Sequence, residues 1–119
     1  MQKAWEFKAR QEFTVDERIY DVHAAIRYSE ELPTIDIPLD GLNIDYGAPC
    51  SNSVRSYAQH MKQVLDADLT QPIILNEHGI IIDGRHRVIK ALVYEKPTIL
   101  AKRFKEDPKD IYDIQENKK

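Results

Sequence analysis

The chain has 119 residues, which is the size of one domain with one modest core. Its 17 Lys and Arg stand against 20 Asp and Glu, and the resulting net charge of −3 excludes an overall basic field for holding nucleic acid. The single cysteine, Cys50, excludes an internal disulfide, and no apolar run is long enough to cross a membrane. We therefore expect a cytoplasmic protein without a membrane partner.

The N-terminal quarter predicts a strand and a helix. Apolar and polar residues alternate over 5–9, which indicates a short strand. Thr14 and Glu17 form a capping-box pattern, in which each side chain satisfies a free backbone donor of the other. Apolar residues then recur at helical spacing, which predicts a helix over about 15–30 that ends before Pro33.

The middle of the chain predicts a strand, a loop and a second helix. Apolar and polar residues alternate over 35–39, and Pro38 favours the edge or the end of a sheet strand. Turn residues predict a loop over about 45–52. Apolar residues at steps of three and four then predict a helix over about 54–67.

The last part of the chain predicts a hairpin, a helix and a closing strand. Apolar runs at 72–75 and 80–82 flank a four-residue turn that contains Gly79. A helix over about 85–95 follows, then a strand from 98, and a charged tail from about 106 that is a loose helix or frayed. This order predicts an α+β fold, with a small mixed sheet and packed helices, in a single domain over residues 1–119.

The strand-to-helix junction at Asp83-Gly84-Arg85-His86-Arg87 is the segment with the clearest chemistry. A helix N-terminus presents unpaired N–H groups and a positive dipole end, and Gly84 has no Cβ to keep an anion away. Two arginines in the first turn are unfavourable there unless an anion compensates them, which points to a phosphate or carboxylate ligand. On the alternative reading, Asp83 is a simple cap, His86 caps a neighbouring carbonyl and the arginines point to solvent.

The run from Pro72 to Leu92 resembles the ParB/sulfiredoxin superfamily, whose pattern is P-I-x-V … G-x-I-x-D-G-x-H-R-x-x-A. The resemblance covers about residues 33–105, with the 15–30 helix as an extra layer or a homodimer contact. It implies a ParB-like fold whose motif helix binds nucleotide phosphates. Sulfiredoxins carry a reactive cysteine where this chain has Arg85, so thiol repair is not expected. Partition proteins add a helix-turn-helix domain, and only a few residues follow the closing strand here.

The D-G-x-H-R form is similar to the branch that contains free-serine kinases and small proteins known as ParB-like nucleases. Serine kinases usually have histidine where Arg85 stands, so the substrate and the reaction stay open. The resemblance implies binding of ATP or CTP with Mg²⁺, and either NTP hydrolysis or phosphoryl transfer to a small-molecule acceptor. The alternatives are a DNA-processing nuclease of plasmid or phage context, which the net charge disfavours, and a non-catalytic regulator or adaptor.

The resemblance also implies individual site residues. Asp83 is the candidate catalytic residue and has two expected roles: it orients His86 or Arg87, or it is the candidate Mg²⁺ ligand. Two further contacts at the start of the preceding helix are weaker candidates. The expected nucleotide-binding residues are Gly84, Arg85, His86 and Arg87, with Ser53 and Arg55 as the weaker pair.

Overall fold

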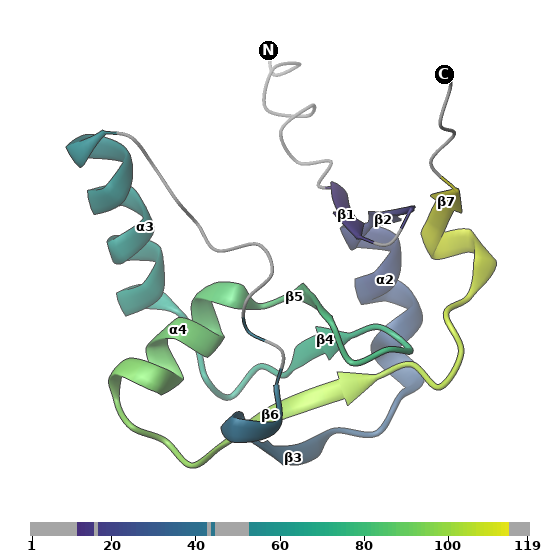
Figure 1. Ribbon diagram of the computed structural model, residues 1–119. Helices are drawn as coiled ribbons and strands as arrows, with labels where there is room; N and C mark the ends of the chain where they lie inside the picture. Colours follow the sequence, from purple (N-terminus) through teal and green to yellow (C-terminus); the bar gives the residue numbers. More distant parts are fainter. Residues whose placement is uncertain (1–11, 16, 43, 45–52, 115–119) are drawn as a thin grey trace.

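The computed structural model describes residues 12–15, 17–42, 44 and 53–114, and within them the chain forms an α+β fold with three helices and two small sheets (Figure 1). The expected α+β class is therefore confirmed. The expected strand at 5–9 and loop at 45–52 lie outside the described residues. Within the described part of the chain, no helix is long and apolar enough to span a bilayer.

The larger sheet is mixed and carries the motif hairpin. Its strand order is β3-β6-β4-β5, in which β6 runs parallel to β4 and the other pairs are antiparallel. Pro38, which cannot donate to a sheet ladder, ends the edge strand, as the sequence predicted. The four strands are β3 (Ile35–Pro38), β4 (Ile73–Leu75), β5 (Ile81–Asp83) and β6 (Thr98–Arg103).

Both faces of the β4–β5 hairpin are buried, because the alternating residues of these strands enter two different cores. Ile74 and Ile82 point into a core shared with α2 (Val22–Tyr28). Ile73 and Ile81 point to the opposite face, where α4 (Arg85–Val93) packs. The consecutive isoleucines in the sequence therefore reflect a strand that is covered on both sides.

The second sheet is antiparallel, with strand order β1-β2-β7, and it replaces the first half of the predicted 15–30 helix. β1 (Glu12–Val15) and β2 (Arg18–Asp21) form a hairpin in which Val15 pairs with Arg18. Glu17 has φ +68°, the left-handed conformation that such tight turns require. The capping-box prediction was wrong, and the side chain of Asp21 caps α2 by accepting from the N–H of Ala24 at 3.2 Å.

The tail predicted as loose or frayed is also part of the fold. A 3₁₀ turn, η3 (Lys109–Ile111), leads into β7 (Tyr112–Ile114), which pairs with β2. Ile111 is fully buried, and Asp107 is 4% exposed. The C-terminal segment therefore completes the small sheet and joins the core that the N-terminal hairpin begins.

The middle helix along the chain, α3 (Val54–Asp66), matches its prediction closely and begins at the N-cap Ser53. It lies at one side of the molecule, where α4 is the element that it packs against (Figure 1). The ammonium group of Lys90 on α4 donates to the carbonyls of Leu65 and Ala67, both at 2.8 Å. These bonds tie the C-terminal end of α3 to α4.

Candidate functional site

Gly84 makes the turn from β5 into α4. Its φ of +110° lies in the left-handed region, and it is the N-cap residue of α4, with Val88 N–H donating to its carbonyl at 3.1 Å. A Cβ on Gly84 would lie 2.5 Å from Ile73 Cγ2, closer than real atoms approach. Glycine is thus required at this position by the left-handed backbone conformation and by the close packing on β4. The simple-cap reading of Asp83 is wrong, since Gly84 occupies the cap position.

Arg87 is held by the junction itself. Its Nη1 donates to the carbonyl of Pro72 at 2.6 Å, and its Nη2 donates to the Asp83 carboxylate at 3.2 Å. Asp83 therefore orients Arg87, which is one of the two functional roles expected for it. The Asp83 carboxylate also offsets part of the positive charge that the two arginines place beside the positive end of the helix dipole.

Arg85 is partly buried, in contrast to the alternative reading in which it points to solvent. Its guanidinium carbon lies 4.1 Å from the centre of the Phe13 ring, a cation–π contact across to β1. Burial lowers the pKa of Arg85, and the charge of Asp83 acts in the opposite direction. Phe13 is a site residue that the sequence did not reveal, because it lies far away along the chain, on a strand next to the residues expected to be helix.

His86 faces a second histidine across the contact between α3 and α4. Its Nε2 lies 3.3 Å from Nδ1 of His60, and the two rings stack with centroids 5.5 Å apart and planes at 25°. Burial lowers the pKa of His86, and the nearby His60 and Arg87 lower it further. His86 is therefore biased toward the neutral imidazole, which can donate one hydrogen bond and accept another.

A cavity of about 270 Å³ opens at this junction. Its lining joins β1, the start of α2, the end of β5 and the first turn of α4. Ser53 and Arg55 are not among the lining residues, and Ser53 is occupied in capping α3 by accepting from Ser56 N–H at 3.0 Å. The lining residues are Glu12, Phe13, Val22, Ile82, Asp83, Gly84, Arg85 and His86.

The described residues do not fit a Mg²⁺ site of the protein's own. Asp83, the expected ligand, is already paired with Arg87. Among the residues that the structure describes, no three His, Cys, Asp or Glu side chains gather as a metal site requires.

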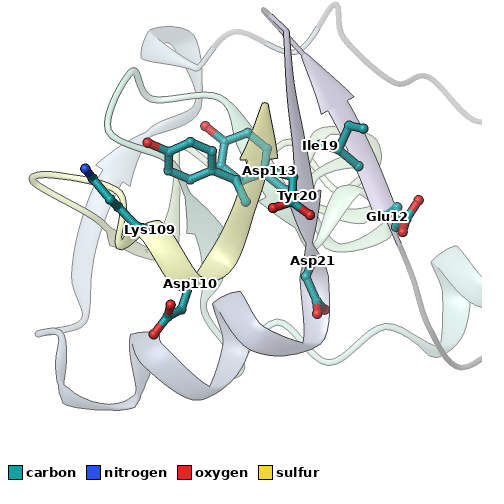
Figure 2. Close-up of a pocket in the computed structure, with 8 residues that line it drawn as sticks. Glu12, Ile19, Tyr20, Asp21, Lys109, Asp110 and Asp113 are labelled. Atoms are coloured by element: carbon teal, nitrogen blue, oxygen red, sulfur yellow. The ribbon is translucent and has the colours of Figure 1, made fainter. Parts of the chain in front are cut away.

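A second cavity, of about 230 Å³, lies over the small sheet and is more acidic than the first, whose lining has two carboxylates, Glu12 and Asp83, beside Arg85 (Figure 2). Four carboxylates line it, from Glu12, Asp21, Asp110 and Asp113, against the single ammonium group of Lys109. Two of the carboxylates have structural partners, because Asp21 caps α2 and Asp110 accepts from the Tyr28 hydroxyl at 2.8 Å. This cavity does not suit an anion, which leaves the 83–87 junction as the better phosphate candidate of the two.

Comparison with known proteins adds no further guide. No family model, no curated protein and no solved structure matches this chain.

Proposed function

We propose that this protein binds a nucleotide, ATP or CTP, and that a phosphate group occupies the first turn of α4. The observation that carries the proposal is that Gly84 and His86 line the 270 Å³ cavity at the point where the helix begins. The amides of the first turn have no acceptor within the helix, and the dipole of α4 adds positive potential at the same place.

Each side chain of the junction has a distinct part in this proposal. Arg85 supplies the positive charge at the cavity, and His86 donates a hydrogen bond to a phosphate oxygen. Arg87 and Asp83 act as a positioning pair, because their salt bridge fixes the start of the helix before any ligand arrives. Because Arg87 is already held in place, less conformational entropy is lost when the ligand binds.

We propose nucleotide binding as the primary function of this site. Phosphoryl transfer to a small-molecule acceptor, or NTP hydrolysis, would be a further activity of the same site. The ParB-like resemblance of residues 72–92 supports the choice of a nucleotide over a simpler anion. We expect any Mg²⁺ to arrive on the phosphates of the nucleotide. Release of ADP or CDP would identify an enzyme, and binding without release would identify a regulator.

The test is isothermal titration with ATP and with CTP, each with and without Mg²⁺. Arg85→Met keeps an apolar stem over Phe13 and removes the charge, and we expect it to weaken binding by about 10-fold or more. Arg27→Met is the matched control, because Arg27 is exposed in the last turn of α2 and lies outside the cavity lining. Equal affinities for the wild type and Arg85→Met, or no binding at all, would refute the proposed site.

A further inference from the structure

The helix α3 presents an apolar stripe that nothing in the described structure covers. Four large side chains follow one another at steps of three and four residues, the spacing that keeps them on one face. All four are exposed, whereas Val64 is the buried residue of the helix. The stripe consists of Val54, Tyr57, Met61 and Leu65, which are 86%, 58%, 46% and 56% exposed.

The outward orientation of this stripe is fixed by contacts on another side of the helix. His60 stacks on His86, and Lys90 holds the carbonyls of Leu65 and Ala67. These contacts prevent the helix from rotating its apolar face onto α4. An amphipathic helix that is anchored in this way and still exposes its stripe is typical of an interface helix.

The charges beside the stripe indicate what covers it. On a period of 3.6 residues, Arg55, Lys62 and Asp66 all lie along one flank of the stripe, with the positive residue Arg55 in the first turn and the negative residue Asp66 in the last. In an antiparallel pair of identical helices, the same flank of each copy meets the other. Asp66 already pairs with Lys62 of its own helix at 3.0 Å. Arg55 of each copy would then face this Asp66 of the other copy, at both ends of the contact.

We propose that α3 pairs antiparallel with α3 of a second copy of this chain. The stripe is about 16 Å long at 1.5 Å per residue, and its self-pairing places Val54 opposite Leu65 and Tyr57 beside Met61. A parallel pair would instead bring this charged flank toward the flank of the partner helix that carries His60, which already contacts α4. An antiparallel pair also aligns the two helix dipoles favourably. The contact is isologous, as expected for a homodimer.

One short helix per copy buries less than a standard interface, so we expect a dimer that dissociates on dilution. Sedimentation velocity over a wide range of protein concentration should show this equilibrium. Met61→Glu places a charge in the centre of the stripe, and we expect the dimer to disappear at every concentration. Because Met61 is exposed in one copy, far-ultraviolet circular dichroism should show the same fold.

Charge reversal tests the antiparallel arrangement. This test does not depend on the stability of Met61→Glu. Arg55→Glu and Asp66→Arg should each weaken self-association, since each variant sets like charges together at both ends. Mixing the two variants should restore a dimer. At one end the glutamate introduced at position 55 then meets the arginine introduced at position 66, and at the other end the native Asp66 meets the native Arg55. A wild type that stays monomeric throughout, or an equimolar mixture that stays as weak as its components, would overturn the proposal.

Discussion

The hydroxyl of Tyr20 donates to the carboxylate of Asp107 at 2.6 Å, and both groups are buried although 87 residues separate them. Arg18 Nη1 donates to the same carboxylate oxygen at 2.8 Å, and the N–H of Glu77 donates to the other at 2.8 Å. The buried carboxylate thus joins the N-terminal hairpin, the β4–β5 turn and the C-terminal segment. Burial is the main cause of a raised pKa for Tyr20, and the hydrogen bond to Asp107 adds to it.

Removing this hydroxyl should destabilise the protein. Tyr20→Phe deletes the donor to Asp107 and the acceptor for Asn76 Nδ2, which lies 3.1 Å away. Leaving buried polar groups without a partner costs about 1–3 kcal/mol, and we expect the free energy of unfolding in urea to fall by that amount. Tyr28→Phe is the matched control, because its hydrogen bond to Asp110 is exposed. Equal stabilities for the two variants would contradict the role given to Tyr20.

Neutralising Asp107 should release the C-terminal strand. Asp107→Asn loses the charge that pairs with Arg18 and places an NH₂ group among donors. Because Arg18 is only partly buried, we expect the loss of this charged hydrogen bond to cost about 1.5–3 kcal/mol. We expect faster amide hydrogen exchange in β2 and β7, while the protection of β4 and β6 changes less. Uniform loss of protection in all strands would instead show that the two sheets unfold as one unit.

Gly84 and Gly41 should respond differently to an added methyl group. Gly84→Ala meets Ile73 at 2.5 Å and must adopt φ +110°, so we expect a loss of at least about 2 kcal/mol. Gly41→Ala meets nothing within 4 Å and should be close to neutral. Thermal unfolding of the two variants side by side measures the difference. A Gly84→Ala protein as stable as Gly41→Ala would disprove the close packing of the junction on β4.

The part-buried histidine contact should make stability depend on pH. The pKa of His86 is lowered below its ordinary value of 6.5, so the unfolded chain takes up the proton first as the pH falls. This contribution to stability is present above pH 6.5 and is lost as the pH falls toward the lowered pKa. Unfolding in urea at a series of pH values should show this slope in the wild type and less of it in His86→Gln.

The sequence predicted the central elements well because their signals are local. The buried strands β4 and β5 are continuous isoleucine and leucine runs, and the turn between them contains Gly79, with φ +82°. The start of α4 could be predicted because Gly84 ends the apolar strand run and the apolar residues after it recur at helical spacing. For the site, the expected orientation of Arg87 by Asp83 could be predicted because the two residues are only four positions apart, across the strand-to-helix junction.

The errors arose where distant residues decide the structure. Val15 and Ile19 fit a helical period, yet β2 pairs with β7, which lies at the other end of the described chain. The tail is highly charged, and the buried contact of Asp107 with Tyr20 orders it together with that strand pairing. The partners of the junction, Phe13 and His60, were missed for the same reason, because no local spacing links them to residues 85 and 86.

The pairing of β2 with β7 has a consequence for how the chain folds during synthesis. β2 is made early, but its partner follows only after residue 112 has left the ribosome, so the small sheet is among the last parts to form. Until then Tyr20 and Arg18 have no Asp107 to bind, and the hairpin exposes apolar surface. The nascent chain therefore carries an unfinished strand edge from the synthesis of β2 until β7 emerges, and the burial of one carboxylate ends that exposure.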